Sequence, residues 1–182
     1  MRLTRSNFRK RVDRQAEPAI LFTVSSSIFA IAASAVEEIR NIEGLVPCAM
    51  GDTYKGLRKV KFFLERNQRK YLVIDSNLHF HAALSQATRL LVLRNAPLAV
   101  LVDNIDRMCE LSVVRKLPQA FTGEERHWYR GLTVLNDRVI PLVNPQAFLS
   151  QAETAVALSE LLRAGVSSEQ DKNVLAKGAA TA

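Results

Sequence analysis

His79 and His81 are the residues whose types and spacing come closest to a metal site. They stand two positions apart, so both imidazoles would share one face of an extended strand, and the carboxylate of Asp75 is near enough in sequence to join them. No cysteine and no helical spacing completes such a site, and histidines that follow a strand are most often ordinary surface residues. A metal enzyme is therefore the least favoured of three hypotheses, and we expect no metal, cofactor or catalytic residue.

Residues 55–70 are the second candidate for chemistry, because they carry seven basic side chains and one acidic side chain. Phe62, Phe63 and Tyr71 lie among these cations or next to them. On a small OB-like barrel, aromatic rings stack on bases while cations contact phosphates, so a basic protein that binds single-stranded nucleic acid is our alternative hypothesis. The alternation of Val60, Lys61 and Phe62 instead favours a hairpin with its aromatic rings in the core, and we do not expect nucleic acid as the partner.

Composition and motifs exclude other classes of function. Hydrophobic residues make up 48% and charged residues 24% of the 182 residues, which is typical of a folded globular chain. The net charge of +7 comes from residues 1–18 and 55–70, and the rest of the chain is slightly negative. The sequence has no phosphate-binding glycine loop and no Ser/His/Asp arrangement.

The two cysteines and the longest apolar stretch bear on the compartment. Cys48 and Cys109 form no metal-binding cluster, which fits a reducing environment. The longest apolar stretch, residues 28–36, is too short to cross a bilayer. We expect a cytoplasmic protein with no direct membrane insertion.

Short apolar runs separated by turn residues predict a mainly β fold. The predicted strand pairs are 20–24 with 28–32, 60–64 with 70–74, 90–93 with 98–102, and 132–135 with 139–143. Asn136-Asp137 is a two-residue loop of the kind that tight hairpins favour. Asn144 and Pro145 suit the start of a helix, which the apolar periodicity extends over residues 145–164.

The chain also resembles itself, which indicates an internal repeat. Residues 21–24 align with residues 90–93 at an offset of 69, and Val36 falls on Ile105 at the same offset. Tyr54-Lys55-Gly56-Leu57 aligns with Tyr129-Arg130-Gly131-Leu132 at an offset of 75, a drift that loop insertions would produce. We therefore predict two small barrels packed together, with a groove between them that suits a ligand or a helical partner.

The repeat divides the chain into predicted segments. These are a basic flexible arm (1–18), a domain over 19–150 made of units 19–88 and 89–150, a helix (145–164) and a disordered tail (165–182).

Several short motifs, taken in order, resemble the CheW-like family of chemotaxis adaptor (coupling) proteins. The motifs are Val36-Glu37-Glu38-Ile39, Pro47, Tyr54-Lys55-Gly56-Leu57, Leu72-Val73-Ile74-Asp75, Val100-Leu101-Val102-Asp103-Asn104-Ile105, Tyr129-Arg130-Gly131-Leu132 and Pro141-Leu142-Val143-Asn144. The resemblance covers roughly residues 19–150. Two departures stand out: Arg66 alone represents the family's L-R-G turn, and Asn144 replaces an acid.

The resemblance implies two five-stranded SH3-like β-barrels, a C-terminal α-helix and no catalysis. It implies an adaptor that couples the cytoplasmic tip of a chemoreceptor to the regulatory domain of a chemotaxis-type histidine kinase. The implied candidates for the receptor groove are Val36, Ile39, Val102 and Ile105, and those for the kinase-facing barrel end are Tyr54, Gly56 and Arg66. Asp75 and Asp103 end strands, and we expect them to cap turns.

Overall fold

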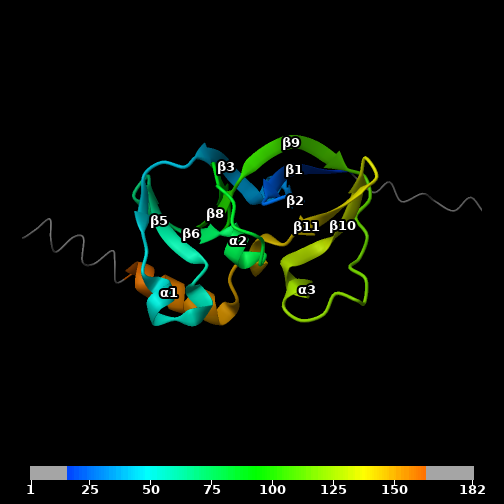
Figure 1. Ribbon diagram of the computed structural model, residues 1–182. Coiled ribbons are helices and arrows are strands. Elements are labelled where there is room, and N and C mark those ends of the chain that lie inside the picture. The colour runs from blue at the N-terminus through cyan, green and yellow to red at the C-terminus, as the bar shows by residue number, and fades with distance from the viewer. Residues whose placement is uncertain (1–15, 163–182) are drawn as a thin grey trace, which may run out of the picture.

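The computed structural model describes residues 16–162, which form two β-sheets that lie side by side with short helical turns between strands (Figure 1). The strands are β1 (Glu17–Val24), β2 (Ser27–Ala32), β3 (Val36–Asn41), β4 (Leu45–Pro47), β5 (Val60–Arg66), β6 (Arg69–Asp75), β7 (Arg89–Leu93), β8 (Leu98–Val102), β9 (Asn104–Leu111), β10 (Tyr129–Leu135) and β11 (Arg138–Val143). The turns of helix are η1 (Ala33–Ala35), α1 (Met50–Thr53), η2 (Lys55–Leu57), α2 (Ser76–His79), α3 (Glu125–Trp128) and η3 (Pro145–Ala147), and residues 151–162 form a further helix. Most of the predicted arm and all of the predicted tail lie outside the described residues.

The four predicted strand pairs are confirmed as antiparallel ladders: β1 with β2, β5 with β6, β7 with β8, and β10 with β11. Two of the turns use left-handed residues, with φ of 49° and 62° at Asn67 and Gln68 and of 49° and 61° at Asn136 and Asp137. Two consecutive positive φ values match the twist of the flanking strands, which explains why these polar pairs close the hairpins.

The strand orders of the two sheets are equivalent. The first sheet runs β10-β11-β2-β1-β9, and the second runs β5-β6-β8-β7-β3 with β4 added beside β5. Each strand of the first order has its counterpart 69 residues away in the second, and β11–β2 and β6–β8 are the parallel pairs. The chain exchanges its hairpins, because β1 and β2 join β9–β11 while β7 and β8 join β3–β6. Neither predicted unit, 19–88 or 89–150, therefore supplies a whole sheet.

The same spacing extends to the irregular features. Lys61 and Arg130 are each bulged out of register, and Asp75 and Asn144 each cap the turn that follows the last strand. The spacing stays at 69 where the sequence alignment drifted to 75. Tyr54-Lys55-Gly56-Leu57 ends in the 3-10 turn η2, whereas Tyr129-Arg130-Gly131-Leu132 opens β10, so these two similar motifs do not occupy equivalent places.

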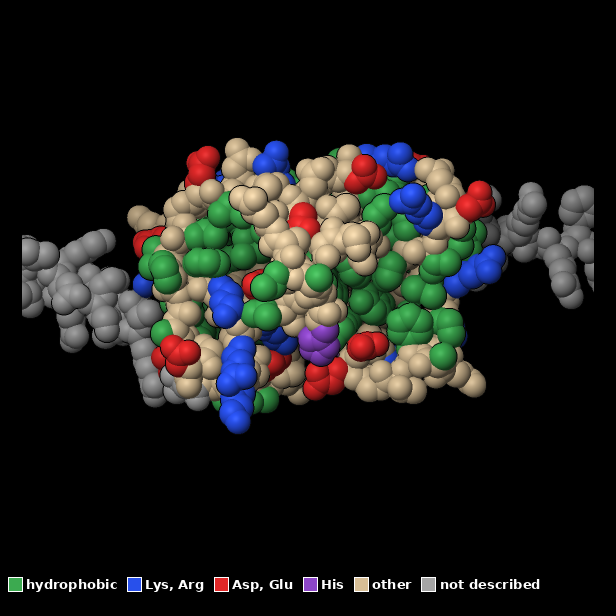
Figure 2. Space-filling model, viewed as in Figure 1, with side chains coloured by type: hydrophobic (Ala, Val, Ile, Leu, Met, Phe, Trp, Pro, Cys, Tyr) green, Lys and Arg blue, Asp and Glu red, His purple; other side chains and the backbone are tan. Residues whose placement is uncertain are grey.

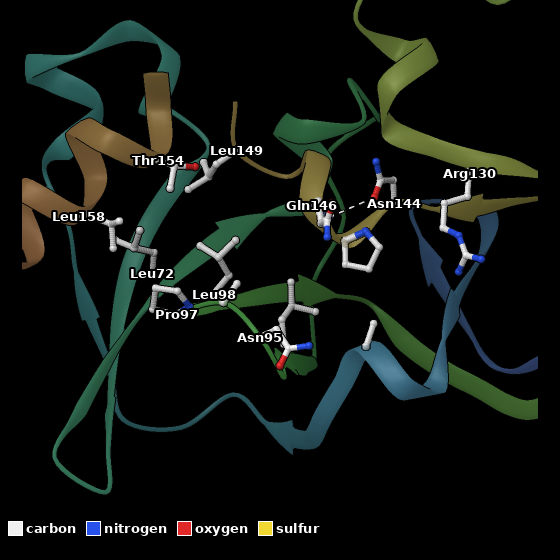
Figure 3. A pocket seen from close by; sticks show the side chains of 14 residues that line it. Leu72, Asn95, Pro97, Leu98, Arg130, Asn144, Gln146, Leu149, Thr154 and Leu158 are labelled. Atoms are coloured by element: carbon white, nitrogen blue, oxygen red, sulfur yellow. Dashed lines mark hydrogen bonds between the residues drawn. The ribbon is translucent and has the colours of Figure 1, made fainter. Parts of the chain in front are cut away.

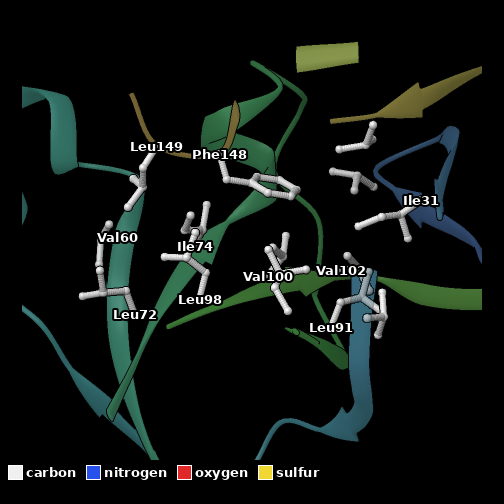
Figure 4. Close-up of a cluster of buried hydrophobic side chains, with 14 of the residues drawn as sticks. Ile31, Val60, Leu72, Ile74, Leu91, Leu98, Val100, Val102, Phe148 and Leu149 are labelled. Atoms are coloured by element: carbon white, nitrogen blue, oxygen red, sulfur yellow. The ribbon is translucent and has the colours of Figure 1, made fainter. Parts of the chain in front are cut away.

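Alternate residues of the central strands serve different cores, which explains their unbroken apolar runs. Leu91 and Val100 belong to a large cluster at the seam between the sheets (Figure 4). Their neighbours Leu90 and Leu101 belong to a smaller cluster inside the second sheet, and Leu21 belongs to a matching cluster inside the first. Each sheet thus curls around its own core and packs its outer face against the other sheet.

The predicted closed, five-stranded SH3-like barrels are not confirmed. The second sheet has six strands, and the strand orders of both sheets are open among the described residues. In the first sheet the place equivalent to β4 is reduced to one bridge between Arg115 and Leu132. The sheets are therefore mixed and strongly curled but do not close.

The C-terminal helix begins later than the sequence prediction placed it. Asn144 caps η3, with its side chain accepting from the Gln146 amide at 3.3 Å. Ser150 caps the continuous helix 151–162, because its Oγ accepts from the Glu153 amide at 3.2 Å while its own amide donates to Glu153 Oε2 at 2.7 Å. This reciprocal capping box, S-x-x-E, is a helix-start signal that the sequence analysis missed.

Candidate docking surfaces

The four residues expected to line a receptor groove do not form one open surface. Val36 and Val102 are buried in the seam core, and Ile105 packs against it half-buried. Ile39, farther along β3, is 40% exposed. Ile39 is therefore the member of this set whose side chain is most available to a partner, while the other three shape the seam from within.

The three residues expected to face the kinase fall in two places. Tyr54 and Gly56 lie next to the start of helix 151–162, where a Cβ on Gly56 would come within 3.1 Å of Glu153 Oε1. Arg66 lies at the opposite end of β5, about 20 Å along a seven-residue strand, and forms an ion pair with Glu38 of β3. By position Arg66 therefore belongs with Ile39, and we call Glu38, Ile39 and Arg66 the β3 surface.

The second place, which we call the helix-start surface, consists of Tyr54, Gly56, Lys59 and Glu153. Lys59 Nζ lies 3.1 Å from Glu153 Oε1 and 3.2 Å from Oε2, and both side chains are largely buried. The bond joins the start of β5 to the helix and so fixes the helix against the second sheet. The sequence analysis missed Lys59 and Glu153 because they are 94 residues apart and neither stands in a local motif.

A groove with a volume of about 540 Å³ lies at the seam, between the β7–β8 turn, the end of β11 and helix 151–162 (Figure 3). Its apolar lining includes Leu72, Leu98 and Leu158, and its polar lining includes Gln146 and Arg130. None of the four predicted groove residues lines it. Figure 2 shows a different face, where apolar side chains reach the surface over both sheets and a mostly polar band lies between them.

The proposed metal ligands have other roles. Asp75 Oδ1 accepts from the amides of Asn77 at 2.9 Å and Leu78 at 3.4 Å, so this carboxylate caps α2 as expected. His79 is 3% exposed and its ring packs against those of Trp128 and Phe148, with centroids 4.9 Å away in each case. Within residues 16–162 no group of three His, Cys, Asp or Glu side chains is placed to hold a metal ion.

Burial has a large effect on the acid–base behaviour of His79. Desolvation, with smaller contributions from the nearby Lys59 and His81 charges, lowers the pKa of His79 to about 3. Its Nε2 is buried and has no hydrogen-bond partner. The imidazole is therefore neutral near neutral pH and acts as an apolar ring at the seam.

Asp103 ties together three segments near the seam. Its Oδ2 accepts from the Ser25 amide at 2.6 Å and its Oδ1 accepts from Ser85 Oγ at 2.7 Å, while Ser85 Oγ also lies 2.9 Å from Asn77 Oδ1. The carboxylate therefore links the β1–β2 turn to the chain that precedes β7. This is the turn-capping role that its place at a strand end predicts.

The aromatic residues of segment 55–70 point inward. Phe62 packs against the core of the second sheet, Phe63 packs against the seam core, and Tyr71 is buried. Lys59 and Arg66 are ion-paired with Glu153 and Glu38. The segment thus lacks the combination of open rings and cations on which the nucleic-acid hypothesis depended.

Comparisons with known proteins agree with this architecture. A search of curated proteins finds no significant match. The crystal structure of the scaffolding protein TtCheW from Thermoanaerobacter tengcongensis is similar in fold, with a TM-score of 0.62 at 12% sequence identity over 74% of this chain and 88% of that chain. No helix among residues 16–162 is long and apolar enough to cross a membrane. Residues 18–153 match the family model of the CheW-like domain, and the chain therefore belongs to the CheW-like family.

Proposed function

We propose that this chain is a non-enzymatic, cytoplasmic adaptor that couples the cytoplasmic tip of a chemoreceptor to the regulatory domain of a chemotaxis-type histidine kinase. The observation that carries the proposal is the presence, on a CheW-like fold, of two docking surfaces at opposite ends of β5. An adaptor must hold two partners at once, and the length of β5 keeps the β3 surface and the helix-start surface apart. The receptor tip takes the β3 surface, and the kinase domain takes the helix-start surface.

The chemistry of each surface supports this division. The β3 surface has an exposed apolar side chain, Ile39, beside the Arg66–Glu38 ion pair, which suits a helix with an apolar stripe and polar flanks. The helix-start surface has Tyr54, 37% exposed, beside a glycine that permits close backbone approach. Adaptor contacts of this kind bury roughly 600–800 Å² on each side.

Isothermal titration calorimetry with a receptor-tip fragment and with a kinase regulatory domain tests the proposal. Ile39→Asp should weaken receptor binding at least about tenfold because it buries a charge in an apolar contact, and it should leave kinase binding unchanged. Met108→Asp is the matched control, since Met108 is 65% exposed at the equivalent position of β9. Tyr54→Ala should weaken kinase binding alone. If neither fragment binds the unmodified chain, the adaptor function is wrong.

The nucleic-acid alternative makes an opposite prediction that the same protein can test. A polyanion-binding protein would bind labelled single strands with an affinity that falls steeply with salt and that Lys61→Ala reduces. With its aromatic rings packed inward, this chain should give a flat fluorescence-anisotropy titration.

A further inference from the structure

The two equivalent hairpins differ in what covers their outer faces. In the second sheet, Phe63 of β5 and Leu72 of β6 pack into the seam core, together with Ala157 and Leu161 of helix 151–162. Their counterparts 69 residues later, Leu132 of β10 and Pro141 of β11, form the same cross-strand pair. An amphipathic helix therefore covers this face in one sheet, and the helix has no described counterpart in the other.

The uncovered face is apolar farther along the hairpin as well. Val134 and Val139 are directly opposite each other and are 52% and 63% exposed. The counterpart pair in the second sheet is Glu65 and Lys70, which are charged, as expected for a pair in water. We call Leu132, Val134, Val139 and Pro141 the bare hairpin face. Its apolar pair at the solvent-facing end is typical of a surface that a further segment covers.

The chain enters the described structure at the base of this face. Glu17, the first residue of β1, makes two bonds to Arg130 of β10, from Nη1 to Oε1 at 2.7 Å and from Nη2 to Oε2 at 3.2 Å. Arg130 stands two residues before Leu132 on the same strand. This bidentate pair holds the root of residues 1–15 beside the hairpin that carries the bare face.

Residues 1–15 have the length and the side chains to cover it. Fifteen residues reach about 22 Å as a helix and about 50 Å when extended, whereas the seven residues of β10 span about 20 Å. Phe8 and Val12 are four positions apart, a spacing that places both on one side of a helix, and Leu3 is a third apolar residue among six basic ones.

We propose that residues 1–15 pack against the bare hairpin face through Phe8 and Val12, and so cover in the first sheet what helix 151–162 covers in the second. The contact lies outside both surfaces assigned to the receptor and the kinase. It needs neither partner, so it stands or falls separately from the adaptor function.

Methyl NMR of the whole chain tests this proposal. Removal of residues 1–15 leaves β1 intact, because that strand begins at Glu17, and it should shift the methyl signals of Val134 and Val139. Val46, 57% exposed on β4 of the other sheet, is the matched probe that should not shift. Phe8→Ala with Val12→Ala should reproduce the shift, while Arg5→Ala with Arg9→Ala should not. A synthetic peptide of residues 1–15 should restore the original signals when it is added to the shortened chain.

Two results would overturn the proposal. If the Val134 and Val139 signals of the full and shortened chains superimpose, residues 1–15 do not cover the face. If those signals instead move with protein concentration in both chains alike, a second copy occupies it.

Discussion

The two sheets of this molecule are built to one plan but present different surfaces. They share their strand order, a bulge at the base of one hairpin, a two-residue turn at its tip and a capped turn after the last strand. They differ in their surroundings: the second sheet has β4 and helix 151–162 against it, whereas the first has one bridge at Arg115 and an uncovered hairpin. Turn chemistry and core pattern therefore specify the topology, while the residues outside the repeat decide which faces remain for partners.

The largest expected effect tests the covered face against the bare one. Leu72→Ala should lower the free energy of unfolding by about 4 kcal/mol, because Leu72 is 1% exposed beneath the helix and the change leaves a cavity. Pro141→Ala at the equivalent position should cost less than about 1 kcal/mol. Urea denaturation of the two variants measures the difference, and equal losses would show that the two faces are equally packed.

The two glycines of the Tyr-x-Gly-Leu motifs give the next largest effect. A Cβ on Gly131 would lie 2.4 Å from the Arg115 carbonyl oxygen, which the bridge to Leu132 holds in place. Gly131→Ala should therefore destabilise the fold by about 3 kcal/mol. A Cβ on Gly56 would meet the end of the Tyr54 side chain at 2.8 Å, and Tyr54 can turn away, so Gly56→Ala should cost about 1 kcal/mol. The reverse order in urea denaturation would contradict this comparison.

His79 and Phe148 occupy equivalent positions, 69 residues apart, and their rings meet at the seam. Between pH 6.5 and about 3 the unfolded chain protonates His79 and the folded chain does not, so the free energy of unfolding should fall as the pH falls through this range. The loss attributable to this group is about 2 kcal/mol at pH 5. His79→Phe, which makes the two positions alike, should remove that part of the pH dependence.

Denaturation at pH 7 and pH 5 checks this prediction, with His81→Phe as the control because His81 is exposed. If His79→Phe leaves the pH dependence unchanged, the imidazole is protonated in the folded state and the apolar seam is described incorrectly.

The smallest effect concerns the bond that fixes helix 151–162. Glu153→Gln keeps the capping box but removes the charge that faces Lys59, and it should cost about 1 kcal/mol. Hydrogen exchange should show faster opening of the helix amides in this variant. Glu124→Gln, at an exposed position, should leave exchange unchanged, and a similar acceleration there would show that the effect is not specific to the Lys59 pair.

The local elements of this fold could be predicted because their signals lie within a few residues. Asn136-Asp137 announced its hairpin, and alternating turn residues and apolar runs located the other three. The exchange of β1–β2 and β7–β8 between sheets could not be predicted, because residues such as Leu90 and Leu91 face two different cores and every position is equally apolar.

The candidate site was predicted less well than the fold. Val36 and Val102 were expected at a groove because apolar β residues look the same whether they face a core or a partner. Lys59 and Glu153 were missed because their contact depends on tertiary structure. The helix start was placed at Asn144 because a good cap followed by proline precedes the true start by six residues, and Ser150 with Glu153 carries an equally valid signal.

The most direct test of the account is whether one copy of this chain holds both partners at once. Sedimentation velocity of the chain mixed with a receptor-tip fragment and a kinase regulatory domain, at concentrations where weak complexes form, should show a ternary complex that Ile39→Asp reduces to a binary complex with the kinase domain. Two partners that displace each other, or a chain that sediments alone, would contradict the existence of two separate docking surfaces.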